Sequence, residues 1–374
     1  MKIAVLGASY LQLPLVQKAK SNGIEIHCFA WDDGKAVCKA VADYFYDISV
    51  LEKEIIFDKC KEIGIDGILT IATDICIPTI AYIAEKLNLV GNTYQTALLT
   101  TNKGLMRNCF SENNILSPFY QVIENYSQLK DVNFPLIVKP VDRSGSLGVV
   151  KVEDNESLQQ AIDNATTFSF SKQCIVEEFM EGEEVSVETV SWKGKHQIIT
   201  ITDKVITNAP YFVEIAHHQP STHNEKIIAE IEKTALEILN ATQVTNGISH
   251  IELMITKDGH VKAIEIGSRM GGDFIGSDLV QLSTGIDFLQ VALDCALGTV
   301  KFPIQKKLNK NSGIYFLSKD TEYLLPLFNK DNQNVKIVKK EILSDKLLSL
   351  TSSNDRSGYL IYQSNQKESF SKYH

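Results

Sequence analysis

The sequence predicts an α/β domain, followed by a larger α+β region and a small β-rich C-terminal part. Strand and helix patterns alternate over the first ninety or so residues, which favours a parallel, doubly wound sheet. From about residue 120, strand patterns crowd together and only two long helical patterns interrupt them, which is typical of an α+β region. The 374 residues would make two or three domains of about 150 residues each.

The first region contains patterns for strands and helices in alternation. Apolar runs predict strands at residues 3–6, 24–29 and 67–72. A helix is expected from Pro14 to Asn22, where Gly23 stops it. Another opens at Pro78, and its apolar positions 80, 83, 84 and 87 have the spacing of a buried stripe. Proline in the first turn and Gly91 after the end agree with the usual asymmetry of helix termini.

The loop after the first strand departs from the dinucleotide-binding fingerprint. That fingerprint is G-x-G-x-x-G, whereas the stretch from Gly7 to Gln12 is G-A-S-Y-L-Q. Tyr10 and Gln12 would block the close approach of the backbone to a pyrophosphate. The sequence therefore favours a Rossmann-like domain without a bound nucleotide over a nicotinamide site.

Strand patterns dominate the rest of the chain. They fall at residues 135–139, 148–152, 174–178, 185–192, 196–202, 250–256 and 261–266. The clearest helix has apolar residues at 228, 231, 235 and 238, spaced three, four and three. Short strands are expected at 313–317, 335–338 and 358–362, followed by a polar tail.

Charge and cysteine content exclude several function classes. With 37 basic and 46 acidic residues the net charge is −9, which argues against a nucleic-acid partner. Apolar runs stay short of the roughly 18 residues of a membrane span, and Gly7 comes too early for a signal peptide. Seven scattered cysteines without a C-x-x-C pair predict reduced thiols in a cytoplasmic protein, with a nucleophilic cysteine as the less favoured alternative.

One predicted hairpin places two carboxylates side by side. Asp258-Gly259 between alternating apolar runs is a strong turn signal. A turn centred there makes Glu252 face Glu265, with Cβ atoms about 5 Å apart. Like charges in this position predict a bound cation or a shared proton, and oxygen ligands suit Mg²⁺. The other face would pack in the core through Ile251, Leu253, Ile255, Ile264 and Ile266. A solvated polar face is the alternative, and a three-residue loop would remove the pairing.

A second pattern joins a lysine to a flexible loop. Lys139 closes an apolar strand, and a loop with two serines and two glycines follows at residues 144–148. Lysine and backbone N–H groups suit phosphate oxygens, although an ordinary hairpin loop fits the pattern equally well. Further on, residues 175–188 are rich in glutamate, and such a stretch alone is usually a solvated edge.

Taken in order, these motifs resemble the ATP-grasp superfamily. Within it the chain is similar to carboxylate–amine ligases, and particularly to the L-amino acid ligases, over about residues 1–300. The resemblance implies a Rossmann-like preATP-grasp domain at 1–95 and a two-subdomain ATP-grasp domain at 96–300, whose lid spans about 121–188. Residues 301–374 would then be a C-terminal β-rich subdomain.

The resemblance also implies roles for individual residues. ATP phosphates would contact Lys103 and Lys139 beneath a flap that contains Ser144, Gly145, Ser146 and Gly148; adenine would lie near Glu177, Glu178 and Phe179, and ribose near Glu184. Glu252 and Glu265 would hold one or two Mg²⁺ ions, with Mn²⁺ as a possible substitute. Arg269 matches the arginine that steadies the acyl phosphate. Many members have a ligating asparagine where this chain has Gly267, which puts a second ion in doubt.

The substrate side is implied by a segment and a glycine loop. Glu214 and His217 match the positions that hold the amino end of the substrate, although a surface strand is the alternative. Gly271, Gly272 and Asp273 should line the acceptor side. Asp273 stands where some relatives have a bulky aromatic residue, so a wider pocket for a cationic or hydroxylated partner is a hypothesis.

The resulting expectation is an ATP-dependent ligase that joins a small carboxylate to an amine through an acyl phosphate, releasing ADP and phosphate. An ATP-grasp enzyme of other chemistry, such as phosphoryl transfer or carboxylation, is one alternative. A nucleotide-binding module without catalysis is another. A homodimer is expected because dimers are common among the proteins it resembles.

Overall fold

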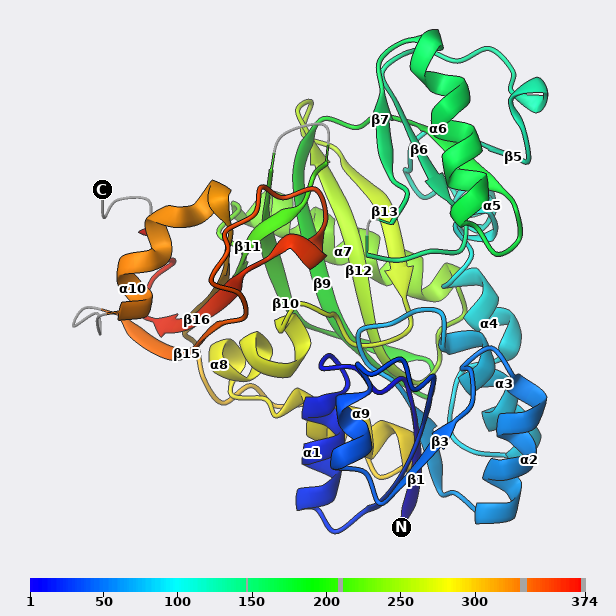
Figure 1. The fold of residues 1–374 in the computed structure, drawn as a ribbon, viewed down its shortest axis with the longest axis vertical. Helices are drawn as coiled ribbons and strands as arrows, with labels where there is room; N and C mark the ends of the chain where they lie inside the picture. The colour runs from blue at the N-terminus through cyan, green and yellow to red at the C-terminus, as the bar shows by residue number, and fades with distance from the viewer. Residues whose placement is uncertain (146, 208–210, 330–334, 371–374) are drawn as a thin grey trace.

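The computed structural model describes residues 1–145, 147–207, 211–329 and 335–370, which form three sheets with their covering helices (Figure 1). The N-terminal sheet is parallel, in the order β3-β2-β1-β4. Its strands are β1 (Lys2–Leu6), β2 (Glu25–Ala30), β3 (Tyr44–Asp47) and β4 (Gly67–Leu69), and its helices are α1 (Leu13–Ser21), α2 (Lys53–Ile63) and α3 (Ile77–Leu87). A late helix, α9 (Phe288–Ala296), packs against α1. The expected doubly wound α/β domain is confirmed.

Gln12 takes the space that a dinucleotide loop would leave open. Its side-chain oxygen accepts hydrogen bonds from the backbone N–H of Ser9 (3.1 Å) and from the Ser9 hydroxyl (2.8 Å). Its amide nitrogen donates to the carbonyl of Ile71 at 2.7 Å. Gly7 adopts φ +90°, and a Cβ there would press on Gln12 at 3.1 Å. The loop is therefore closed by its own glutamine.

A small antiparallel sheet forms the upper lobe in Figure 1. Its order is β5-β8-β6-β7, from β5 (Tyr120–Ile123), β6 (Leu136–Pro140), β7 (Val150–Val152) and β8 (Cys174–Glu178). Helix α6 (Asn155–Phe168) packs its apolar side on this sheet through Leu158 and Ile162. Helices α4 (Tyr94–Leu99) and α5 (Lys103–Glu112) connect this lobe to the N-terminal domain.

The largest sheet has eight antiparallel strands in the order β13-β12-β9-β10-β11-β14-β16-β15. They are β9 (Gly182–Trp192), β10 (Lys195–Ile206), β11 (Glu214–Gln219), β12 (Gly247–Thr256), β13 (Val261–Gly267), β14 (Asn311–Leu317), β15 (Lys336–Ile342) and β16 (Gly358–Ser364). Helix α7 (Glu225–Ala241) covers one face, while the π-helical turn η3 (Ile275–Leu279), α8 (Val280–Thr284) and α10 (Leu325–Asn329) complete the fold. The C-terminal strands extend this sheet, since β14 pairs with β11.

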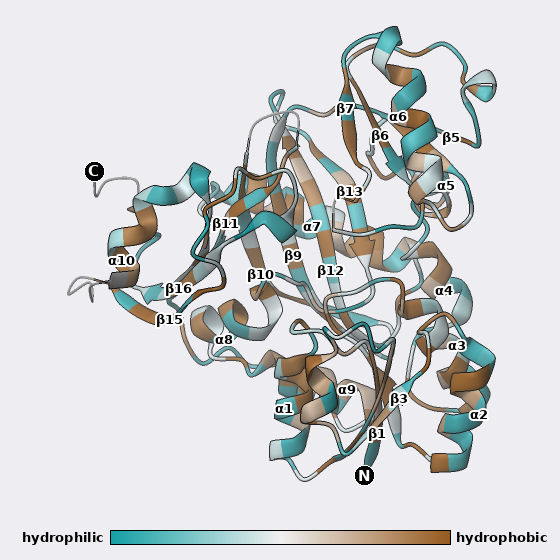
Figure 2. Ribbon diagram, in the orientation of Figure 1, coloured by the Kyte–Doolittle hydropathy of each residue, from teal (hydrophilic) through white to brown (hydrophobic). Residues whose placement is uncertain are grey.

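Hydropathy follows the layers (Figure 2). Strands such as β9 and β12 are largely hydrophobic where helices cover them, and α2 and α6 alternate between hydrophobic and hydrophilic residues. Within the described ranges, none of the helices has both the length and the apolar character needed to cross a membrane.

The hairpin of β12 and β13 has a different turn from the one expected. Near the turn Leu253 pairs with Ala263, which leaves a three-residue loop at 257–259. Ile264 is then an extra residue on β13, and this bulge restores the pairing of Glu252 with Glu265. The predicted pairing is confirmed, but the predicted two-residue turn is wrong.

The bulge also reverses the expected face of one residue. Ile264 was expected in the core, but it is partly exposed and lines the large cavity. Val261, Ala263 and Ile266 form the core face of β13 instead. A single extra residue changes which side chains point inward because the strand alternates with period two.

Replacing Gln12 with alanine should lower the free energy of unfolding by about 1–3 kcal/mol, because the buried Ile71 carbonyl and the Ser9 groups lose their partner. Chemical denaturation measures this loss. Gln17→Ala, at an exposed position on α1, is the matched control and should change stability little. Equal losses in the two variants would contradict the role of Gln12.

Candidate active site

A cavity of about 1210 Å³ lies where the three sheets meet. It is lined by the loops after β1 and β4, by strands of both antiparallel sheets, and by the segment from Gly267 to Asp273. The expected residues found on its wall are Lys103, Lys139, Ser144, Gly145, Glu177, Glu178, Phe179, Glu184, Glu214, His217, Glu252, Glu265, Arg269, Gly272 and Asp273. Gly148 and Gly271 are not among the described residues that line the cavity, and Ser146 is outside the described residues.

Lysine and arginine side chains gather at one end of the cavity. Lys103 begins α5, whose N-terminus is capped by the Asn102 side chain. Its Nζ donates to the carbonyl of Arg143 (2.7 Å) and pairs with Glu265 (3.0 Å). Lys139, on β6, pairs with Glu177 at 2.6 Å. These contacts hold two ammonium groups at the place where the sequence predicts phosphates.

Glu177 serves as the anchor of this cationic cluster. Its carboxylate lies 2.7 Å from Nε of Arg107, and it also holds Lys139. Burial raises and the two cations lower the pKa of Glu177, with a net fall. Burial lowers the pKa of Lys139. The cluster has three cations, Lys103, Arg107 and Lys139, and two carboxylates, those of Glu177 and Glu265. This excess of positive charge favours the binding of an anion. Contact of Glu177 with adenine stays a prediction.

Arg107 is a member of this cluster that sequence reasoning missed. It is fully buried, and its two terminal nitrogens have no hydrogen-bond partner in the part of the chain that the structure describes. Its spacing, four residues after Lys103 on one helix, places both side chains on the same face. That spacing was the available signal.

The flap is anchored at its start. The Asp142 carboxylate accepts from the backbone N–H groups of Phe170 (3.2 Å) and Ser171 (2.9 Å). The Arg143 guanidinium lies 3.5 Å from the ring centre of Phe170. Gly148 packs against Phe168 and Pro140, with φ +76°, so its role is in the loop geometry and not in lining the cavity.

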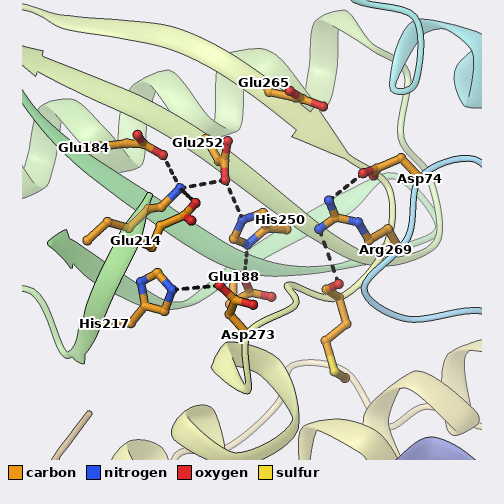
Figure 3. A network of polar contacts seen from close by, with 12 residues as sticks. Asp74, Glu184, Glu188, Glu214, His217, His250, Glu252, Glu265, Arg269 and Asp273 are labelled. Carbon is orange, nitrogen blue, oxygen red and sulfur yellow. Dashed lines mark hydrogen bonds and ion pairs between the residues drawn. The ribbon is translucent and has the colours of Figure 1, made fainter. Parts of the chain in front are cut away.

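Glu252 and Glu265 fit a hard divalent cation. They are direct cross-strand neighbours, and Figure 3 shows both carboxylates on the same side of the sheet. In the described residues, no group of three or more acidic, histidine or cysteine side chains is arranged to hold a metal ion. Two carboxylates would therefore need phosphate and water oxygens to complete the coordination, which suits a metal–nucleotide complex.

Arg269 is held by an acid from the N-terminal domain. Its guanidinium donates to Asp74 at 2.7 Å, and both side chains are largely buried (Figure 3). A side chain at position 267 would run into the Asp74 carboxylate and the Arg269 guanidinium. Glycine at position 267 therefore leaves this space to the ion pair of Asp74 and Arg269.

Glu188 and His250 connect Glu252 to the loop that contains Gly271. The two residues are paired across β9 and β12, and Nδ1 of His250 contacts the Glu188 carboxylate. Nε2 of His250 lies 3.3 Å from Glu252, and Glu188 accepts from the backbone N–H of Gly271 at 3.2 Å. A Cβ at Gly271 would lie 2.5 Å from Glu188, so glycine is required there. His250 is two residues before Glu252 on β12, so strand alternation places both side chains on the same face of the sheet, and this spacing could have indicated that His250 belongs to the site.

An arginine from the C-terminal part forms ion pairs with both Glu214 and Asp273, the residues expected on the substrate side. Arg356 donates to Asp273 at 2.8 Å and to the carboxylate of Glu214 at 3.2 Å, and it stacks on Phe316. Nε2 of His217 lies 3.4 Å from Asp273, and burial lowers the pKa of His217. Asp273 is thus already paired with a permanent cation, which weakens the expectation that it selects a cationic partner. The sequence carried no signal for Arg356.

Lys204 is a further residue that sequence reasoning missed. It lies on β10, is buried, and pairs with Glu184, Glu252 (2.9 Å) and Glu214 (3.5 Å). Burial lowers and these carboxylates raise the pKa of Lys204, which ends well above its ordinary value. Burial alone would favour a neutral Glu252, but Lys204 and His250 hold its pKa well below the usual range. The Lys204 ammonium group and the Glu252 carboxylate are therefore both charged at neutral pH.

Comparison with known proteins agrees with this geometry. Residues 132–278 match the model of the ATP-grasp domain. Alanine–anticapsin ligase of Bacillus subtilis strain 168 is 24% identical over 308 residues, which are 72% of this chain and 65% of that protein. An L-arginine-specific L-amino acid ligase of Bacillus subtilis is 22% identical, over 69% of this chain and 63% of that protein.

Solved structures extend the likeness to the whole fold. The crystal structure of the L-amino acid ligase from Bacillus licheniformis has a TM-score of 0.79 at 22% identity, and covers 98% of this chain and 93% of that one. The chain thus has an ATP-grasp fold, and its resemblance to the ATP-grasp superfamily, and within it to the L-amino acid ligases, is confirmed.

Stability should decline at alkaline pH because of His250. Burial lowers but Glu188 raises its pKa, to about 9 against an ordinary 6.5. The folded state therefore holds the proton more tightly, so its contribution is complete below pH 6.5 and is lost as pH rises through about 9. Relative to His250→Gln, the unfolding free energy of the wild type should fall by up to about 1.4 kcal/mol per pH unit across this window. Parallel pH profiles of the two proteins would contradict this.

Proposed function

We propose that this protein is an ATP-dependent carboxylate–amine ligase acting on small molecules. The observation that carries the proposal is the side-by-side pair of Glu252 and Glu265 in a cavity with the cations Lys103 and Lys139 at one end and Arg269 beside it. Similarity to amino acid ligases supports the same reaction class.

In the proposed reaction, an oxygen of the substrate carboxylate attacks the γ-phosphorus of ATP, and the bond to the β–γ bridging oxygen breaks. ADP leaves and an acyl phosphate remains. The amine then attacks the acyl carbon, loses a proton, and expels inorganic phosphate. Lys103 and Lys139 neutralise charge on the phosphates, and Arg269, oriented by Asp74, stabilises the oxyanion of the acyl centre. When bound, Mg²⁺ would supply further neutralisation of the phosphate oxygens.

The substrate's amino end would lie at Glu214 and His217, close to Asp273 and Arg356. The flap between Arg143 and Gly148 would close over the nucleotide. Closure would exclude water, which otherwise hydrolyses an acyl phosphate. The C-terminal part would contribute Ser353 and Asn354 to the pocket wall, and its Arg356 would position Glu214 and Asp273.

The proposal extends to the setting of the enzyme. We infer a cytoplasmic enzyme that uses one or two Mg²⁺ ions, accepts Mn²⁺ in their place, and forms a homodimer. The net charge of −9 and seven free cysteines support a protein of a reducing compartment without nucleic-acid or membrane partners.

A screen of ADP release against pairs of amino acids and small carboxylates, with mass spectrometry of the products, tests the function. A condensed product with one ADP per bond supports it. Trapping with hydroxylamine distinguishes the alternatives, because an acyl phosphate gives a hydroxamate whereas phosphoryl transfer to a hydroxyl gives none. ATP binding without ADP under every acceptor mixture would favour the non-catalytic module.

Glu265→Gln and Arg269→Ala should each reduce amine-dependent ADP release by about 10²-fold or more, because Glu265 would hold the metal ion and Arg269 would face the developing oxyanion. A coupled ADP assay measures this, with circular dichroism to confirm folding. Glu62→Gln, which changes an exposed glutamate on α2, is the matched control and should remain active. Near-normal turnover of either active-site variant would contradict its role.

Asp273→Trp should change the product profile by narrowing the acceptor pocket. It also removes one of the two carboxylate partners of Arg356, so loss of activity alone is ambiguous. The double variant Asp273→Trp with Arg356→Leu removes this partly uncompensated cation and should recover turnover with the new profile. An unchanged profile in the double variant would exclude a selective role for Asp273.

A further inference from the structure

Lys204 lies at the junction of three carboxylates that have different expected partners. Its ammonium group contacts Glu184 on β9, Glu214 on β11 and Glu252 on β12, and its side chain is only 4% exposed. Figure 3 shows these glutamates turned toward one another. In the proposed enzyme they serve the ribose, the substrate's amino group and the metal ion, respectively.

The lysine offsets a repulsion that the sheet imposes. Neighbouring strands place the three acids close together, and unscreened like charges in a buried site would push the side chains apart. One ammonium group with three donors can hold all three. Lys204 thus keeps the acids in place when the cavity holds no ligand.

The same contact affects the metal carboxylates. The Glu252 carboxylate pairs with the ammonium group of Lys204 at 2.9 Å, and the Glu265 carboxylate pairs with that of Lys103 at 3.0 Å. Each of the two acids thus has a lysine as a partner, and Lys204 is shared with Glu184 and Glu214. A divalent cation that enters alone must compete with both ammonium groups for Glu252 and Glu265.

A nucleotide changes this balance. Its phosphates offer Lys103 another partner, which frees Glu265. Lys204 retains Glu184 and Glu214 when Glu252 turns to the metal. The metal–nucleotide complex also carries compensating negative charge, so its entry does not leave the lysines unpaired.

We propose that Lys204 is a positioning residue that makes divalent-cation binding dependent on the nucleotide. It masks Glu252 in the ligand-free protein and holds the ribose and amine carboxylates in the loaded one. This inference rests on the proposed function for the roles of the three glutamates, and it adds an order of binding: the metal enters with the nucleotide and not before it.

The test measures Mn²⁺ binding by electron paramagnetic resonance on the full chain, with and without ADP. Wild type should bind Mn²⁺ weakly alone and at least about tenfold more tightly with ADP. Lys204→Met should bind Mn²⁺ alone at least about tenfold more tightly than wild type, so the gain from ADP shrinks. Lys204→Arg keeps the charge and should restore the dependence on ADP.

Two further variants serve as a control and as a substitute test. Lys59→Met removes a partly exposed lysine on α2, outside the cavity lining, and should leave Mn²⁺ binding unchanged. If Lys204→Met fails to fold, Glu214→Gln serves instead. Because it removes a competing acid, Lys204 should hold Glu252 more tightly, and Mn²⁺ alone should bind more weakly than to wild type.

Tight Mn²⁺ binding by ligand-free wild type would overturn the inference. So would a folded Lys204→Met variant that binds no more tightly than wild type, or a Glu214→Gln variant that binds equally or better. These outcomes are separate from the proposed function. If wild type releases no ADP with any substrate pair, the proposed ligase function is rejected. If wild type releases ADP normally but Lys204→Met binds Mn²⁺ no more tightly than wild type, only the role of Lys204 is rejected.

Discussion

The site depends on two like charges that the backbone forces to be neighbours. Glu252 and Glu265 face each other on adjacent strands, in a partly buried position where their repulsion must be compensated. In the ligand-free protein Lys103 and Lys204 compensate it. In the proposed reaction a divalent cation and the phosphates of ATP do so. The same electrostatic demand therefore shapes both the empty site and the loaded one.

Distant parts of the chain meet this demand together. The N-terminal domain provides Asp74 for Arg269, and the C-terminal strands provide Arg356 for Glu214 and Asp273. All three ion pairs are long-range, and Asp74, Arg269 and Arg356 are largely buried. The eight-stranded sheet makes this possible because β14–β16 continue it from β11. Ser353 and Asn354 thereby reach the cavity wall, and Arg356 pairs with Glu214 and Asp273, which line the cavity. The C-terminal part thus belongs to the same sheet as the cavity residues and contacts them directly.

The sequence predicted the fold class, and most of the site residues that it singled out lie on the cavity wall, since strand alternation and the order of motifs are local signals. It predicted the facing glutamates from a turn that does not occur. The bulge at Ile264 restored their register, and bulges leave no reliable trace in apolar periodicity. Lys204, Asp74 and Arg356 escaped prediction because their importance comes from long-range pairing. A lone charged residue in a strand has the same appearance whether it faces water or three carboxylates.

The most direct test of the central claim is a crystal structure with Mn²⁺ and a non-hydrolysable ATP analogue, with the metal located by anomalous scattering. We expect a metal peak bounded by one oxygen of Glu252, one oxygen of Glu265 and phosphate oxygens, with ligand distances of about 2.0–2.2 Å. A metal peak away from these two carboxylates, or a triphosphate remote from Lys103 and Lys139, would contradict it.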